Sequence, residues 1–94
     1  MLYLNVLLTV KDRKDVDTVK SLLTEAGRLS REEPGCARFE VYQSTADDTR
    51  FFLNEHWQTQ EGLDGHRKGV AYTQIYQQKV MPLIEREGHP SNLL

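Results

Sequence analysis

His66 is the residue of this chain whose type and position best support proton-transfer chemistry. Leu63 lies three residues before it and Val70 four residues after it, so in a helix all three side chains share one face. That face is apolar, which directs the imidazole toward the interior. Because an imidazole exchanges protons near neutral pH, the position predicts a general base. A histidine on an apolar face is also a common packing residue, and the residues alone leave both interpretations open.

Two further candidates lie in the run 51–57, FFLNEHW, which is typical of a strand. Strand alternation places Glu55 and Trp57 on one face. A carboxylate there would be half buried, so we expect Glu55 to pair with Arg38 or a helix residue, or else to tune His66 and the substrate. Trp57 would fill the space under the helices and could also stack against a flat substrate ring.

Asn5 and Tyr72 complete the predicted substrate-binding set. Asn5 could donate a hydrogen bond to a substrate oxygen, or bond backbone at the rim of a pocket. Tyr72 lies four residues before Tyr76 on a predicted helix, so the pair could belong to the core, the rim or a lid. We favour Tyr72 as a pocket-lining residue.

Motifs for metals and cofactors are missing from the sequence. The three histidines form no i, i+4 pair, and Cys36 is the single cysteine, so we expect neither a metal site nor a disulfide. The sequence has no glycine-rich phosphate loop and no Rossmann fingerprint, so we expect no nucleotide or flavin cofactor.

Length and charge exclude several classes of protein. Ninety-four residues make one domain, 1–94. The 12 basic and 14 acidic residues are well mixed and give a net charge of −2, which argues against nucleic acid as a partner. The apolar N-terminal run stops at Val10 with no basic region before it, so we expect no signal peptide, no membrane span and a cytoplasmic protein.

The hydrophobic pattern predicts the order strand, helix, strand, strand, helix, helix. This order is typical of a ferredoxin-like split βαβ fold of the α+β class, with an antiparallel sheet and helices on one face. The tail 86–94 could add a brief closing strand. The expected elements are strands at 2–10, 36–44 and 50–58, a helix from Asp12 or Asp15 to about Pro34, a helix at 60–68 capped by Thr59, and a helix at about 70–81.

The first strand carries apolar residues on both faces, with Leu4 and Val6 on one and Tyr3 and Leu7 on the other. One layer of helices covers only one face of a sheet. A second copy of the chain is the simplest cover for the other face, so the pattern predicts a homodimer.

The run EEPGCARFEVYQS at 32–44, followed by FFLNEHW and then by EGLDGH at 61–66, resembles the antibiotic biosynthesis monooxygenase (ABM) domain family over about residues 2–84. The resemblance implies a dimeric α/β barrel with a pocket in each subunit. Members include cofactor-free oxygenases of quinols and anthrones, haem-degrading enzymes and a processor of a phosphorylated signal. Haem degradation ranks low: Asn5 matches that branch, but His66 replaces its tryptophan and Tyr76 its haem-ligating histidine.

We therefore expect a cofactor-independent monooxygenase that acts with O₂ on quinol-like or anthrone-like aromatic substrates, with His66 as base. One alternative is a non-catalytic dimeric domain that binds small hydrophobic ligands. Another is an isomerase of a small phosphorylated signal molecule, which would need a basic cluster near the pocket. Arg67 and Lys68 are the candidates for that cluster.

Overall fold

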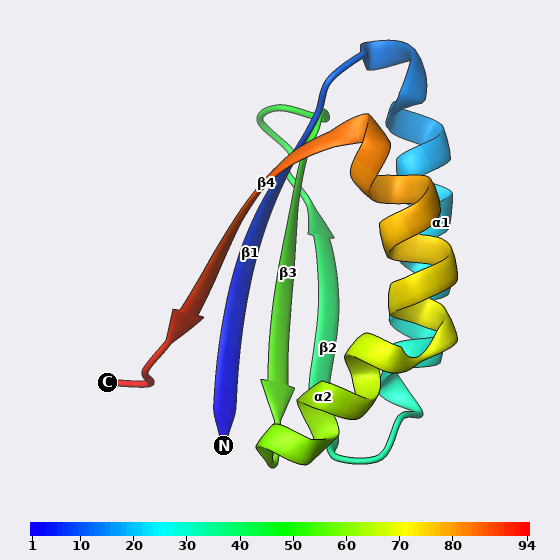
Figure 1. Cartoon of the computed structure of the whole chain (residues 1–94). Coiled ribbons are helices and arrows are strands. Elements are labelled where there is room, and N and C mark those ends of the chain that lie inside the picture. The colour runs from blue at the N-terminus through cyan, green and yellow to red at the C-terminus, as the bar shows by residue number, and fades with distance from the viewer.

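The computed structural model describes all 94 residues and shows a four-stranded antiparallel sheet with every helix on one of its faces (Figure 1). The strand order is β2-β3-β1-β4, which confirms the predicted ferredoxin-like fold of the α+β class. The elements are β1 (Leu2–Val10), η1 (Arg13–Asp15), α1 (Val16–Arg31), β2 (Cys36–Gln43), β3 (Arg50–Trp57), α2 (Gln60–Lys68), η2 (Ala71–Val80), η3 (Met81–Leu83) and β4 (Ile84–Ser91).

Strand register decides which side chains reach the helices. β1 pairs with β3 so that Leu4 lies opposite Glu55 and Asn5 opposite Asn54. Residues directly opposite each other in an antiparallel pair share a face. The face with Leu4, Glu55 and the buried Val6 lies under the helices, and the face with Asn5 and Asn54 is the outer one.

α1 forms because apolar residues recur at helical spacing, and Val19, Leu23 and Ala26 are buried against the sheet. The two aspartates before it act differently from each other. The Asp12 side chain accepts a hydrogen bond from the Lys14 N–H and so caps η1, whereas Asp15 begins α1 without a side-chain cap. The short η1 turn follows Asp12 and includes Asp15.

The predicted helix at about 70–81 is present, but it is a π-helix, η2, and the short 3₁₀ turn η3 follows it around Pro82. Its buried residues are Ala71, Tyr76 and Val80, and their spacings of five and then four residues keep them close to one face of a helix whose hydrogen bonds run from i to i+5. π-Helical segments are rare and frequently accompany functional sites.

The tail forms a full strand rather than a brief one. β4 begins at Ile84, two residues before the expected start, and pairs with β1 along eight residues. The full length of this strand could not be predicted from its polar composition. It is an edge strand in which only Ile84 is buried. None of the helices combines the length and the hydrophobicity that a membrane span requires.

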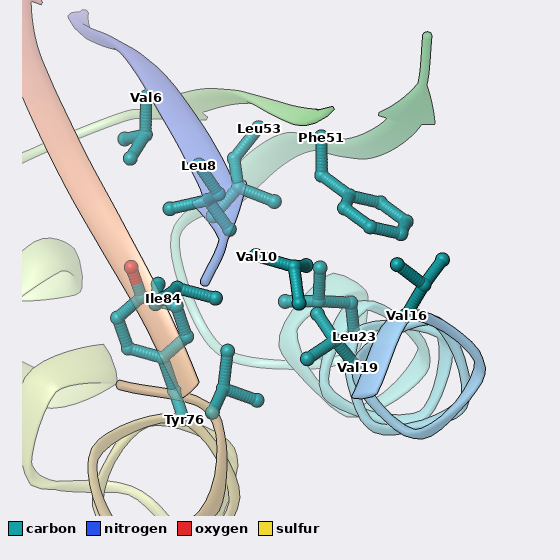
Figure 2. Packing of buried hydrophobic residues seen from close by; sticks show 11 residues of the cluster. Val6, Leu8, Val10, Val16, Val19, Leu23, Phe51, Leu53, Tyr76 and Ile84 are labelled. Atoms are coloured by element: carbon teal, nitrogen blue, oxygen red, sulfur yellow. The ribbon is translucent and has the colours of Figure 1, made fainter. Parts of the chain in front are cut away.

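The main core lies between α1, η2 and the sheet, where aliphatic and aromatic side chains interlock (Figure 2). Leu8, Val19 and Phe51 are at most 1% exposed. A smaller apolar cluster of Phe39 and Trp57 with Leu63 from α2 lies at the α2 end of the sheet. Between the two clusters the packing is incomplete.

Candidate functional site

A cavity of 230 Å³ lies between the sheet and the helices and contains polar groups on an otherwise apolar wall. Ser30, Glu55 and His66 are the buried polar or charged residues of the protein, and all three line this cavity. Concave apolar sites with a few convergent polar groups are the usual form of small-molecule sites. The remaining lining residues are Leu4, Val6, Leu23, Ala26, Phe39, Leu53, Leu63, Arg67, Ala71, Tyr72, Tyr76, Arg86, Gly88 and Pro90.

His66 forms a short contact with a carboxylate that the sequence did not reveal. Its Nδ1 lies 2.6 Å from Oε1 of Glu33, in the turn after α1. The carboxylate holds the ring in the tautomer that carries the proton on Nδ1. No protein group bonds Nε2, so its lone pair is available on a ring that lines the cavity. A base with a defined orientation results.

Two glycines bring Glu33 to His66. Gly35 has φ +82°, which closes the turn after α1. A Cβ added to Gly35 would lie 3.2 Å from the Gly62 Cα in α2, so the two backbones approach where neither carries a side chain. α2 itself begins as predicted, with the Thr59 side chain accepting a hydrogen bond from the Gly62 N–H.

Aromatic rings surround the imidazole of His66. The Trp57 ring lies 4.6 Å from it at 33°, Tyr72 5.5 Å away at 66° and Phe39 5.6 Å away at 53°. Tyr72 and Phe39 line the cavity, whereas Trp57 is fully buried and is not part of its wall. Trp57 therefore packs against the His66 ring and does not present a surface to a ligand in the cavity.

Glu55 is a buried carboxyl in the cavity wall. Its Oε1 accepts a hydrogen bond of 3.0 Å from the Trp57 indole N–H, which is a partner that we did not foresee. Arg38 is unsuitable because it lies opposite His56, on the outer face. Burial raises the pKa of Glu55 above its ordinary value, although the Trp57 hydrogen bond opposes this shift.

Positive charge lines another part of the cavity. Arg86 of β4 donates a hydrogen bond of 3.0 Å from Nε to the Tyr76 hydroxyl, and its guanidinium lies 6.0 Å from the centre of the Tyr76 ring. Burial raises the pKa of Tyr76, which keeps the phenol protonated at neutral pH. Arg67 of α2 also lines the cavity, so two arginines from distant parts of the chain share one site.

Asn5 lies on the outer face of the sheet, away from the cavity. Its side chain donates to Ser91 Oγ at 3.1 Å and accepts from the Asn54 amide at 2.8 Å. Of the five predicted site residues, the structure brings Glu55, His66 and Tyr72 together in the cavity wall, with Trp57 behind His66. Asn5 does not join them.

No cluster of three or more His, Cys, Asp or Glu side chains has the arrangement of a metal site. Tyr76, at the position that corresponds to the haem ligand of the haem-degrading branch, has its hydroxyl bonded to Arg86. These residues therefore do not fit the ligand set of that branch.

Comparison with known proteins places the chain in a family. The family model described as antibiotic biosynthesis monooxygenase matches residues 1–78. No curated protein matches the chain.

Solved structures share the fold along nearly the whole chain. One is a conserved protein of unknown function from Bacteroides thetaiotaomicron, for which an oxidoreductase role has been suggested, with 24% identity, TM-score 0.87 and coverage of 96% of this chain and 94% of the other. Another is a candidate antibiotic biosynthesis monooxygenase from Nitrosomonas europaea, with 24% identity, TM-score 0.86 and 98% of both chains. A candidate of the same kind from Deinococcus radiodurans has 17% identity and TM-score 0.82 over 100% and 95%.

At these identities the solved structures show the fold alone, and the family rests on the matched model. With that match over 78 residues and the fold just described, the chain belongs to the antibiotic biosynthesis monooxygenase family.

Proposed function

We propose that the protein is a cofactor-independent monooxygenase that acts with O₂ on small quinol-like or anthrone-like aromatic substrates. The observation that carries this proposal is the Glu33–His66 pair, whose free imidazole nitrogen borders an aromatic-lined cavity. A buried, oriented base next to an apolar hollow is suited to removing a proton from a phenol.

The reaction begins when His66 Nε2 takes a proton from a hydroxyl of the quinol, and Glu33 stabilises the imidazolium that forms. The quinol anion passes one electron to O₂, and the resulting semiquinone and superoxide radicals combine at a ring carbon. The peroxide formed there loses water, which leaves one oxygen atom on the ring as a hydroxyquinone. The quinol supplies every electron, so the balance needs no further reductant.

Cavity size restricts the substrate. An engineered cavity of about 150 Å³ holds benzene, so 230 Å³ is suited to one or two fused rings. Larger polycyclic substrates would require the cavity to open where Arg67, Arg86 and Pro90 lie at its exposed edge.

The test is oxygen uptake with 1,4-dihydroxynaphthalene, corrected for its uncatalysed oxidation. His66→Ala should lower the enzymatic rate by a factor of about 10² to 10⁴, which is the usual range for loss of a general base. The exposed His89→Ala is a matched control and should keep the wild-type rate. Equal rates in wild type and His66→Ala would exclude His66 as the base. Ligand binding without uptake across a broad hydroquinone panel would favour a non-catalytic binding domain.

We also propose that the protein is a homodimer with its outer sheet faces together. Tyr3, Leu7 and Phe52 are half-buried on that face, and Tyr42 is 47% exposed beside them. Apolar side chains on an uncovered sheet face need a cover. Sedimentation equilibrium should give twice the mass of 10.9 kDa for wild type and the monomer mass for Phe52→Glu. A monomeric wild type at micromolar concentration would reject the dimer.

A second candidate function follows from the two arginines. Arg67 and Arg86 line the cavity together with His66, and such a pair suits a ligand with a carboxylate or phosphate group. Processing of a small phosphorylated molecule is thus the alternative reaction. If the rate of O₂ uptake does not depend on an anionic group on the substrate, the quinol reaction is favoured. Turnover of a phosphorylated substrate without O₂ favours the alternative reaction.

A cytoplasmic location remains part of the proposal. It rests on the single cysteine, Cys36, which has no partner for a disulfide.

A further inference from the structure

Ser30 is a buried hydroxyl without a hydrogen-bond partner, and it lines the cavity. It lies in the last turn of α1 and is 0% exposed. Ser30 Oγ is the one side-chain nitrogen or oxygen atom shut off from solvent that has no partner. Buried polar groups without partners are uncommon and each one needs a reason.

Other helical hydroxyls of this protein show what Ser30 does not do. Thr24 donates to the Lys20 carbonyl at 2.7 Å, and Thr73 donates to the Gly69 carbonyl at 2.8 Å. This bond to the carbonyl four residues earlier is the ordinary choice of a serine or threonine in a helix. Ser30 makes no such bond to Ala26, so its hydroxyl remains without a partner in the wall of the cavity.

The surroundings of Ser30 do not explain the hydroxyl by packing alone. Ala26, one turn earlier on the same face of α1, lines the same cavity and has no polar group. Alanine at position 30 would fill almost the same volume and would avoid the cost of a buried, unpaired hydroxyl, about 1–3 kcal/mol. We therefore expect the serine to lower the stability of the protein without a ligand, a cost that proteins accept at functional sites.

We propose that Ser30 is a ligand-binding residue that donates a hydrogen bond to an oxygen of the bound aromatic molecule. The ligand class is therefore a ring system with a phenol or carbonyl oxygen on the side that faces α1. The inference rests on the proposed function only because it requires the cavity to accept an aromatic guest. It assigns no proton transfer to Ser30, because His66 already supplies the base.

The contact also gives selectivity. A site that places a hydrogen-bonding group against a ligand oxygen discriminates against the analogue without that oxygen. A single neutral hydrogen bond contributes about 0.5–1.5 kcal/mol, which corresponds to roughly a 2- to 13-fold difference in affinity.

The experiment compares two ligands of nearly equal shape, 1-naphthol and 1-methylnaphthalene, by titration calorimetry. Wild type should prefer 1-naphthol by about 2- to 13-fold. Ser30→Ala should lose most of that preference by weakening 1-naphthol, with no weaker binding of 1-methylnaphthalene. Ser21→Ala, the same substitution on the exposed face of α1, should keep the wild-type preference for 1-naphthol. An unchanged preference in Ser30→Ala overturns the proposal, because the ligand oxygen then bonds elsewhere.

Thermal unfolding of the empty protein gives a second readout. Ser30→Ala should keep or raise the melting temperature, because it removes an unpaired polar group. A fall of several degrees would mean that the hydroxyl is bonded in the empty protein and would overturn the premise. Failure of the monooxygenase proposal looks different, because absent oxygen uptake leaves the Ser30-dependent preference for 1-naphthol intact.

Discussion

The two ends of the space between helices and sheet differ in composition although β1, β3 and α1 run through both. At the end where α1 begins, Val19 and Leu8 pack with Phe51 into an aliphatic and aromatic cluster (Figure 2). At the end where α1 stops, the wall holds Ser30, Glu55 and His66 around a 230 Å³ cavity.

This difference indicates that one end mainly stabilises the fold and the other is suited to binding a ligand. Close packing at one end supplies the hydrophobic contribution that holds the layers together. A cavity and buried polar groups cost stability, and proteins retain such features mainly at functional sites. The end with the cavity, which we call the hollow end, can be unfavourable for folding. The end with Leu8, Val19 and Phe51, which we call the packed end, compensates for it.

The largest expected effect tests the packed end. Leu8→Ala should destabilise the protein by about 2–5 kcal/mol, because Leu8 is 1% exposed and its removal leaves a void. Leu4→Ala is the matched control, since Leu4 lies on the same strand and face but is half-buried beside the existing cavity. Leu4→Ala should lower the free energy of unfolding by less than about 1.5 kcal/mol. Urea unfolding measures both, and equal losses would contradict the distinction between the two ends.

The next effect concerns catalysis at the hollow end. Glu33→Gln removes the charge that stabilises protonated His66 and should lower oxygen uptake by about 10- to 100-fold, or about 1.4–2.7 kcal/mol. The neighbouring exposed Glu32→Gln is the control and should behave as wild type. A normal rate in Glu33→Gln would show that the carboxylate only helps packing.

Much of the fold could be predicted from sequence because its signals are local. Helical spacing of apolar residues located α1, and Thr59 with Gly69 bounded α2 at the observed residues. The π-helix was missed because the sequence pattern of η2 also fits an α-helix. β4 was only half anticipated, since its pairing with β1 supplies stability that its own composition does not show.

The site was predictable only where strand parity sufficed. Alternation along β3 placed Glu55 correctly on the helix-covered face. Asn5 was grouped with these residues without aligning the two strands, and its pairing with Asn54 puts it on the outer face. Glu33 was missed because 33 residues separate it from His66. The sequence does indicate a tight turn at Gly35, close to Glu33. The contact of this turn with α2 depends on the tertiary structure and could not be predicted.

Buried Glu55 should make the hollow end sensitive to pH. Because its pKa is raised in the folded protein, the unfolded chain ionises first, near the ordinary value of 4.5. Wild-type stability should therefore fall as pH rises from 4.5 to the folded pKa and then level off. Glu55→Gln escapes this loss, so it should be more stable than wild type at neutral pH and show little difference at pH 4.

Thermal unfolding from pH 4 to 8 at fixed protein concentration measures this difference. Exposed Glu85→Gln serves as the control and should track wild type at every pH. A gap between Glu55→Gln and wild type that shrinks as pH rises would mean that ionised Glu55 is better stabilised in the folded protein than in water.

The smallest effect comes from the same kind of enlargement made at each end. Ala26→Leu adds carbon atoms where the cavity has room, so it should raise stability by about 0.5–1 kcal/mol while weakening 1-naphthol binding. Val19→Leu adds one methylene where Val19 is 0% exposed and closely packed, so it should lower stability by about 1 kcal/mol. Opposite signs in urea unfolding would locate the free volume of the core at the polar end. The same sign in both variants would show that the cavity collapses around its wall and is no preformed site.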